Sequence, residues 1–289
     1  MGLSPSDILG RALGIGRGDR PGFFAGAVAA ITGAGSGIGR ALAFELDRRG
    51  AQLALADIDT DSLARTRDQC AAPDSISVTG LDVADKPAVE QWAQATIDRF
   101  GRIDVVITCA GILHVGSVPS SPVTDFDTVM HTNFFGTLHV TKAFLPHLHP
   151  AANRARIVTL SSAVGLAAMP GHGPYTAAKF AIRGYTEALR ADLAGTAIRV
   201  VGVYPGGIRT PIARGALVAP GVDKSAAIHR FERRVARTDA DTAARVIVTG
   251  IERGTPRVLV GADARLADLA ARLAGAHYDR LVTLAARFA

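Results

Sequence analysis

The sequence predicts an α/β protein with a doubly wound parallel sheet of about seven strands, flanked by helices. Two observations support this prediction. Short apolar runs, typical of strands buried on both faces, alternate along the chain with longer segments that carry apolar residues at helical spacing. The 289 residues also suit one large α/β domain, or two small ones.

Seven apolar runs are expected to be the strands: residues 28–32, 53–56, 76–79, 104–108, 156–160, 198–203 and 257–261. Amphipathic segments over residues 85–100, 123–149 and 242–253 are expected to be helices, the second with an interruption at Pro146. Because parallel strands need long crossover connections, this alternation predicts parallel pairing.

Composition argues against several classes of protein. The net charge is +6, but there is no block of five or more Lys or Arg residues, so nucleic-acid binding is not expected. There is also no run of about 18 apolar residues, so no membrane span is expected. Cys109, one of two cysteines, follows a buried strand, so a disulfide is not expected and a reducing cytoplasm fits. His147 and His149 lack a nearby carboxylate or thiol, so no metal site is expected.

A glycine-rich turn follows the first strand, at residues 33–39. Its glycines let the backbone approach a diphosphate closely, and the free N–H groups of the next helix attract negative charge. An ordinary tight turn can have the same composition. The position between a strand and a helix near the start of the chain favours a nucleotide site.

Tyr175 and Lys179 lie four residues apart, which on a helix places them on one face, about one turn apart. An ammonium group beside a phenol favours the phenolate. We therefore expect Tyr175 to have a pKa below its ordinary value of about 10 and to exchange a proton near neutral pH. Such pairs also occur by chance on solvated helices. Ser162, at the end of an expected strand, makes the combination specific, with Ser161 as the second candidate.

The pattern Thr-Gly-x-x-x-Gly-Ile-Gly over residues 32–39, together with Ser162 and Tyr175-x-x-x-Lys179, resembles the classical branch of the short-chain dehydrogenase/reductase (SDR) family. The resemblance covers residues 26 to about 262, with the motifs in the family's order. It implies a Rossmann-type fold and an NAD(P)-dependent enzyme that acts on CH–OH groups.

The resemblance also implies roles for four catalytic residues. Tyr175 would transfer a proton, Ser162 would hold the substrate oxygen, and Lys179 would acidify Tyr175 and hold the nicotinamide ribose. Asn133 would bend its helix and hold a water that leads to Lys179. Without the resemblance, Asn133 would be read as a neutral surface residue.

Cofactor-binding positions follow from the same resemblance. They are Gly33, Gly35, Ser36, Gly37, Ile38, Gly39, Asp57, Ile58, Asp82, Val83, Ala110, Gly111, Tyr175, Lys179, Pro205, Gly206, Ile208 and Thr210. Asp57, at the end of the second strand, can accept hydrogen bonds from a ribose diol and would repel a 2′-phosphate. Since neither Ser36 nor Ile58 is basic, NAD is favoured over NADP. Asp57 and Asp82 could instead cap the helices that follow them.

The chain departs from the family's pattern at residues 108–109. Thr108 and Cys109 replace the usual pair of Asn residues before Ala110 and Gly111. The Ala-Gly pair still lets the backbone pass close to a cofactor. The hydrogen bonds that the second Asn makes to the central sheet are in doubt. No base is evident near Cys109, so packing is favoured over a nucleophilic role.

The expected organisation is an N-terminal extension (1–22), a dinucleotide-binding and catalytic domain (23–262), and a C-terminal amphipathic helix (263–289). Within the domain, residues 211–235 are expected to form a substrate lid. The lid carries Arg214, Lys224, His229, Arg230, Arg233 and Arg234, which could attract an acidic substrate or simply face solvent.

The C-terminal helix carries an apolar stripe made by Leu266, Leu269, Leu273, His277, Leu281, Leu284 and Phe288. The stripe could pack against its own domain or a second subunit, and a homodimer or homotetramer is expected. Peripheral contact with an acidic membrane surface is the other interpretation, because arginines flank the stripe.

The sequence therefore predicts a cytoplasmic, NAD-dependent oxidoreductase that interconverts a secondary alcohol and a ketone. Apolar residues near the site, Ile112, Leu113, Val164, Leu166 and Met169, favour a hydrophobic substrate. Two alternatives stay open. An isomerase or lyase of the family's extended branch would carry Gly-x-x-Gly-x-x-Gly, which the turn does not show. A non-catalytic NAD-sensing or interaction protein on the same fold is the second, and the altered residues 108–109 leave room for it.

Overall fold

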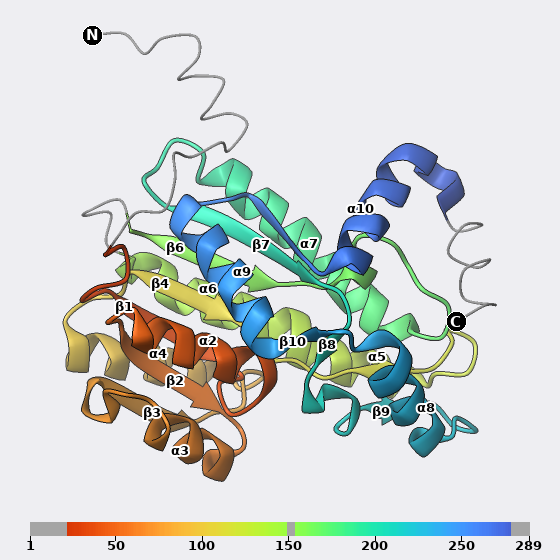
Figure 1. Cartoon of the computed structure of the whole chain (residues 1–289), viewed down its shortest axis with the longest axis horizontal. Helices are drawn as coiled ribbons and strands as arrows, with labels where there is room; N and C mark the ends of the chain where they lie inside the picture. Colours follow the sequence, from red (N-terminus) through yellow and green to blue (C-terminus); the bar gives the residue numbers. More distant parts are fainter. Residues whose placement is uncertain (1–21, 149–153, 279–289) are drawn as a thin grey trace, which may run out of the picture.

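The computed structural model describes residues 22–148 and 154–278 of the chain. At its centre lies a parallel sheet of seven strands in the order β3–β2–β1–β4–β6–β7–β11 (Figure 1). The strands are β1 (Val28–Thr32), β2 (Gln52–Asp57), β3 (Ile76–Gly80), β4 (Val105–Thr108), β6 (Arg156–Leu160), β7 (Arg199–Pro205) and β11 (Arg257–Val260). The chain runs outward from β1 to β3 and then from β4 to β11 on the other side, so the order reverses between β1 and β4. The predicted doubly wound sheet is confirmed.

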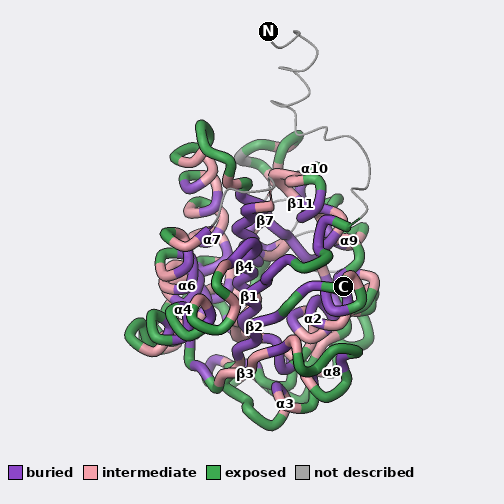
Figure 2. Tube along the Cα trace, turned by 90° about the vertical axis from the view of Figure 1, so that its left-hand side faces the viewer, coloured by how far each residue is buried: buried purple, intermediate pink, exposed green. Residues whose placement is uncertain are grey.

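Helices cover both faces of the sheet, and Figure 2 shows the buried strands between them. One layer contains α2 (Gly37–Arg48), α3 (Thr60–Asp68) and α9 (Ala240–Arg253), and the other contains α4 (Lys86–Phe100), α6 (Gly136–Phe144) and α7 (Gly173–Asp192). Alternation along β1 divides the core. Ala29 and Ile31 pack with α2 and α9, whereas Val28 and Ala30 pack with α4 and α6. Because both faces are covered, the central strands are mainly apolar, and β1 is buried along its whole length.

Short polar side chains and glycines set the helix ends. Asp85 caps α4 by accepting a hydrogen bond from the backbone N of Ala88 at 3.0 Å, and α4 ends at Gly101, whose φ of 72° is left-handed. Asp239 caps α9 in the same way, through the backbone N of Thr242 at 2.7 Å. The observed bounds of these two helices therefore differ by only one or two residues from the expected ones.

The expected helix over residues 123–149 is divided into shorter pieces. It consists of α5 (Val123–Val129), a π-helix η2 (Met130–Phe135), α6 and a 3-10 turn η3 (Leu145–His147), beyond which residues 149–153 lie outside the described part. The π-helix holds Asn133 at its centre. The irregular turn therefore falls where the family resemblance implies a bend.

The segment over residues 211–235 contains η6 (Pro211–Ala213), β9 (Leu217–Val218), α8 (Lys224–Arg230) and η7 (Phe231–Val235). Two short parallel strand pairs, which the sequence analysis did not predict, hold this lid in place. β9 pairs with β5 (His114–Val115), and β8 (Ile208–Arg209) pairs with β10 (Thr238–Asp239). The lid is thus attached to the segment that follows β4 and to the loop that follows β7. The remaining 3-10 turns are η1 (Pro73–Ser75), η5 (Ala163–Gly165) and η8 (Gly275–His277).

The C-terminal helix α10 (Ala262–Ala274) differs from its prediction in length and in packing. The helix ends at Ala274 and is followed by η8 from Gly275. The predicted contacts of Leu281, Leu284 and Phe288 fall in residues 279–289, which lie outside the described part. Its buried residues are Ala264 and Asp268. Leu266, Leu269 and Leu273 are 68%, 52% and 78% exposed. The prediction that these three leucines pack against their own domain is therefore wrong. Polar contacts made by the opposite face of the helix attach it to the domain instead.

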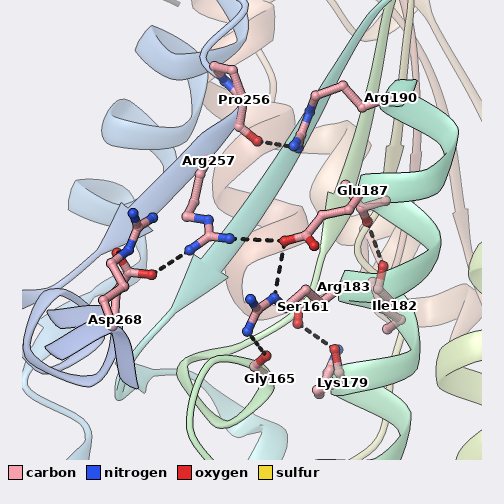
Figure 3. A network of polar contacts seen from close by, with 12 residues as sticks. Ser161, Gly165, Lys179, Ile182, Arg183, Glu187, Arg190, Pro256, Arg257 and Asp268 are labelled. Atoms are coloured by element: carbon pink, nitrogen blue, oxygen red, sulfur yellow. Dashed lines mark hydrogen bonds and ion pairs between the residues drawn. The ribbon is translucent and has the colours of Figure 1, made fainter. Parts of the chain in front are cut away.

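Arg257 on β11 provides these anchors (Figure 3). Its guanidinium lies 2.5 Å from Asp268 Oδ1 on α10 and 2.9 Å from Glu187 Oε1 on α7. Arg272 also pairs with Asp268, at 2.8 Å. Figure 3 shows that the network continues from Glu187 to Arg183 on α7. The last helix is therefore tied to the helix that carries Tyr175 and Lys179. Among the described residues, no helix is long and apolar enough to cross a membrane.

Leu46 on α2 is fully buried in the core shared with α9. Leu46→Ala is expected to lower the free energy of unfolding by about 2–5 kcal/mol, because it removes buried methyl groups and leaves a cavity. Urea denaturation measures the change. Leu266→Ala, at an exposed leucine of α10, is the matched control and is expected to change stability by less than about 0.5 kcal/mol. Equal losses in the two variants would contradict the packing described.

Candidate active site

A cavity of about 480 Å³ opens at the carboxyl ends of the central strands, where the strand order reverses. It is lined by every cofactor position that the sequence predicts except Gly35, and by Ser162, Tyr175 and Lys179. Asn133 does not line it, although its neighbour Thr132 does. The fold thus brings segments that are far apart in sequence to one pocket.

The glycine turn forms one wall of this cavity. A Cβ at Gly33, whose φ is 68°, would lie 2.8 Å from the backbone of Ala110, so neither the conformation nor the space admits a side chain. A Cβ at Gly39 would collide with the carbonyl oxygen of Gly33. The side chain of Ser36 makes no capping hydrogen bond at the start of α2. The turn therefore suits a diphosphate, because it offers close backbone approach and a helix N-terminus.

Asp57 stands at the end of β2 beside the turn. Its Oδ2 accepts a hydrogen bond from the backbone N of Gly35 at 2.8 Å, and its Oδ1 accepts one from the backbone N of Asp59 at 3.0 Å. Each carboxylate oxygen keeps a further lone pair for a ligand. Asp59 caps α3 through Ser62, so the alternative reading of Asp57 as the cap of that helix is wrong. Ile58 is 73% exposed at the rim of the cavity.

Asp82 and Val83 extend this side of the cavity beyond β3. Asp82 Oδ1 accepts a hydrogen bond from the backbone N of Ala84 at 2.9 Å, and Asp85 is the residue that caps α4. Asp82 therefore stabilises a turn at the cavity wall. It is Asp85, and not Asp82, that caps α4.

Tyr175 and Lys179 share one face of α7, and both side chains are buried, with 8% and 5% of their surface exposed. Lys179 Nζ donates a hydrogen bond to the carbonyl oxygen of Leu160 at 3.0 Å and lies 5.4 Å from the centre of the Tyr175 ring. Ser162 follows β6. Its hydroxyl donates a hydrogen bond to the carbonyl oxygen of Pro205 at 3.4 Å and lies close enough to the Tyr175 side chain to lower that phenol's pKa. The cavity thus joins a hydroxyl, a phenol and an amine.

The pKa of Tyr175 differs from the sequence-based expectation. Burial raises it to about 12, and the nearby Ser162 hydroxyl opposes that shift only in part. Burial also lowers the pKa of Lys179 to about 8. The expected lowering of the phenol's pKa by Lys179 is therefore wrong for the protein alone, because removal of water from the phenolate dominates and Lys179 is not among the groups that shift this pKa.

Asn133 is fully buried within the π-helix. Its Oδ1 accepts a hydrogen bond from the backbone N of Ile112 at 2.7 Å, and its Nδ2 donates one to the carbonyl oxygen of Ile112 at 3.0 Å. A Cβ at Gly111 would lie 2.7 Å from Asn133 Oδ1 and 3.7 Å from Lys179 Nζ. Asn133 thus holds the loop after β4 and approaches Lys179. The surface interpretation of Asn133 is wrong.

Thr32 makes hydrogen bonds at the place where the replacement of the usual Asn pair at residues 108–109 left the bonding to the central sheet in doubt. Its Oγ1 accepts hydrogen bonds from the backbone N of Cys109 at 3.1 Å and of Ala110 at 3.2 Å, which joins the ends of β1 and β4. Burial raises the pKa of Cys109 to about 12, so the thiol stays protonated and a nucleophilic role is disfavoured. The sequence analysis missed Thr32 because only the pairing of β1 with β4 shows its partners.

Two further residues support the site from behind. Ser161, the second candidate for the catalytic serine, donates from its Oγ to the backbone oxygen of Lys179 at 2.7 Å and so anchors α7 (Figure 3). Asp263, at the start of α10, accepts a hydrogen bond from the backbone N of Gly207 at 2.6 Å. It braces the loop of Pro205 and Gly206, which lines the cavity. No local pattern in the sequence marks Asp263 for this role.

A doubly wound parallel sheet with a glycine turn at its switch point and a nucleotide-sized cavity defines a Rossmann-type protein. The family model of the short chain dehydrogenases matches residues 27–218. Two thirds of the chain therefore carry that family's sequence pattern, and the chain belongs to the short-chain dehydrogenase/reductase family.

Individual relatives agree with this assignment. The chain is 45% identical over 262 residues to "Putative oxidoreductase SadH" of Mycobacterium tuberculosis, which covers 90% of this chain and 95% of the relative. It is 34% identical over 234 residues to 2-(R)-hydroxypropyl-CoM dehydrogenase of Xanthobacter autotrophicus, which covers 79% and 92%. A solved SDR structure from Burkholderia phymatum, in complex with NAD, matches with a TM-score of 0.75 and 31% identity, over 82% of this chain and 89% of the other.

The depressed pKa of Lys179 predicts a pH-dependent stability. Between pH 8 and 10.5 the Lys179 amine is mostly protonated in the unfolded chain but mostly neutral in the folded protein. The free-energy cost of burying the ammonium is therefore complete below pH 8 and decreases as the pH rises to 10.5. Lys179→Met is expected to raise the free energy of unfolding at pH 7 by up to about 3 kcal/mol, and the gain should shrink over that range.

Urea denaturation at several pH values measures this gain. Lys142→Met, at an exposed lysine of α6, is the control and should give no pH-dependent difference from the wild type. A gain for Lys179→Met that stays constant from pH 7 to 10.5 would show that the ammonium is not the cause.

Proposed function

We propose that the protein is an NAD-dependent oxidoreductase that interconverts a secondary alcohol and a ketone by hydride transfer, on a hydrophobic substrate. The observation that carries this proposal is that Ser162 and the buried side chains of Tyr175 and Lys179 together line the cavity that the glycine turn borders. Membership of a family of oxidoreductases supports it. A cytoplasmic location and a homodimeric or homotetrameric assembly stay predictions from the sequence.

The cofactor proposal rests on the shape and charge of the cavity. Its glycine wall suits a diphosphate, and the neighbouring structure from Burkholderia phymatum holds NAD. We propose NAD rather than NADP because Asp57 lines the cavity at the end of β2 beside the glycine turn, where its carboxylate would accept hydrogen bonds from a ribose diol and repel a 2′-phosphate. Arg40, the cation next to the turn, donates from Nε to Thr66 Oγ1 and from Nη2 to the carbonyl oxygens of Gly35 and Ser62, so two of its three nitrogens are engaged within the protein.

The side chains have separate tasks in this proposal. When bound, NAD supplies the hydride acceptor and NADH the hydride donor. Ser162 Oγ donates a hydrogen bond to the substrate oxygen. Tyr175 Oη gives its proton to the ketone oxygen while hydride reaches the adjacent carbon. In the oxidation direction Tyr175 acts as the phenolate and takes the proton of the alcohol.

Lys179 supplies positive charge next to Tyr175. With a pKa of about 8 it is mostly protonated at pH 7, and a cation close to the phenol favours the phenolate during proton transfer. Asn133 acts through the loop of Gly111 and Ile112, which it holds against the amine. Apolar side chains around Tyr175, among them Leu113 and Val164, favour a substrate with apolar groups beside the reacting carbon.

Tyr175→Phe tests the acid/base assignment. Loss of the phenol is expected to lower kcat by about 10²–10⁴-fold, because the proposed proton acceptor and donor is removed. Turnover is followed through NADH absorbance with a panel of secondary alcohols and ketones, and NADH binding is measured in parallel. Tyr185→Phe, on the same helix but outside the cavity, is the control and should keep its activity. Near-normal turnover by Tyr175→Phe would refute the assignment.

Asp57→Asn tests the choice of cofactor. Removing one negative charge beside the ribose is expected to improve the KM for NADP relative to that for NAD by about tenfold, since repulsion of the 2′-phosphate is lost. Steady-state kinetics with both cofactors measure the ratio. Asp82→Asn, at a second acidic residue of the same cavity, is the control and should affect both cofactors alike. An unchanged ratio in Asp57→Asn would contradict the proposal.

A further inference from the structure

A second, smaller cavity of about 80 Å³ lies under the lid. Val115, Val218, Ile228 and Phe231 are among the residues that line it, from β5, β9, α8 and η7. Nearly all of its lining is aliphatic or aromatic, and Lys224 and His172 are the two polar exceptions. The cavity therefore suits a hydrocarbon segment of a ligand.

This cavity adjoins the catalytic tyrosine. Leu113, Ala213 and Ala216 line the cavity and also belong to the buried apolar cluster that contains Tyr175. Ile228 and Phe231 of the lid pack against the same cluster. Among the residues that the structure describes, the two cavities share no lining residue, so an apolar arm that reaches from a carbon near Tyr175 to the lid passes along the side chains of Leu113, Ala213 and Ala216.

The lid over this cavity is positively charged. Residues 211–235 contain five Lys or Arg residues (Arg214, Lys224, Arg230, Arg233 and Arg234) and two acids (Asp223 and Glu232). Glu232 pairs with Arg214 at 2.9 Å, and Asp223 accepts a hydrogen bond from the backbone N of Ala226 at the start of α8. Within the described part of the chain, no carboxylate lies within ion-pair distance of Lys224.

Lys224 is also the source of positive charge at the cavity itself. His172, the other polar residue of the lining, has a pKa that burial lowers, so its ring stays neutral at pH 7. An anion is strongly disfavoured inside an apolar cavity and is favoured at a rim where a cation and water are both within reach. Lys224 is exposed at this rim, on the first turn of α8.

We propose that the substrate is an amphipathic anion: an aliphatic alcohol or ketone whose apolar segment fills the cavity under the lid and whose carboxylate or phosphate pairs with Lys224. This inference rests on the alcohol/ketone chemistry proposed above and names the substrate class for it. Tyr175 acts at one end of such a molecule and Lys224 binds the other.

The test compares matched compounds. Oxoalkanoic acids with different spacing between ketone and carboxylate are assayed against their neutral methyl esters and against keto-alkyl phosphates of the same chain length. The wild type is expected to show a lower KM for the anions than for the esters. Lys224→Met should raise the KM for the anions roughly fivefold, as for a partly exposed ion pair, with little change in kcat or in the KM for the esters. Lys224→Arg should preserve the preference, and Lys142→Met is the surface control.

The arms of the experiment separate the two anions, because a preference for acids or for phosphates identifies the group that Lys224 binds. Equal KM values for anions and esters in the wild type, or equal loss for both in Lys224→Met, would overturn the proposal. Turnover of esters alone would leave the oxidoreductase function intact and overturn only the anionic substrate.

A binding measurement that needs no turnover separates the inference from the proposed chemistry. A saturated alkanoic acid without a ketone should raise the Tm of the wild type more than its methyl ester does, and Lys224→Met should abolish that difference. If the acid binds in this way but no compound in the panel is turned over, the anion site is supported and the proposed alcohol/ketone chemistry is refuted. If acid and ester shift Tm equally, the proposed anion site is refuted.

Discussion

The close approach of the glycine turn to the end of β4 is the constraint on which the site depends. Gly33 passes so near the backbone of Ala110 that a single Cβ would force the two segments apart. Thr32 holds the same two strands together by accepting hydrogen bonds from the backbone N of Cys109 and of Ala110. The wall of the large cavity is therefore made of backbone, and its shape survives changes of side chain such as those at Thr108 and Cys109.

The catalytic candidates lie where burial works against their charged forms. The fold buries the side chains of Tyr175 and Lys179, and burial shifts the pKa of each in the direction that favours its neutral form. The amine of Lys179 therefore binds its proton more weakly than an exposed lysine does, and the phenol of Tyr175 binds its proton more strongly than an exposed tyrosine does. Destabilisation of this kind is common at functional sites, where a protein gives up some stability for reactivity.

The C-terminal helix is part of the support for the site. Asp263 braces the loop of Gly206 and Gly207, and Asp268 joins α10 to Glu187 on α7 through Arg257. The loop and α7 are thus both held by residues of α10, and Figure 3 shows the contacts from Asp268 through Arg257 to Glu187. The leucines of α10 stay on the outer side, because these polar anchors decide which face of the helix is seated.

The sequence by itself determined the fold class and the strand runs, because these follow from apolar runs and spacing along the chain. It also indicated the positions at the cavity, through the motifs that it shares with the family. Only the tertiary structure decided the pKa of Tyr175, the anchoring role of Ser161, the bridging by Thr32 and the outward direction of the α10 leucines. The physical reason is that desolvation and hydrogen bonding depend on which distant segments surround a side chain. That information appears when β1, β4, α7 and α10 come together.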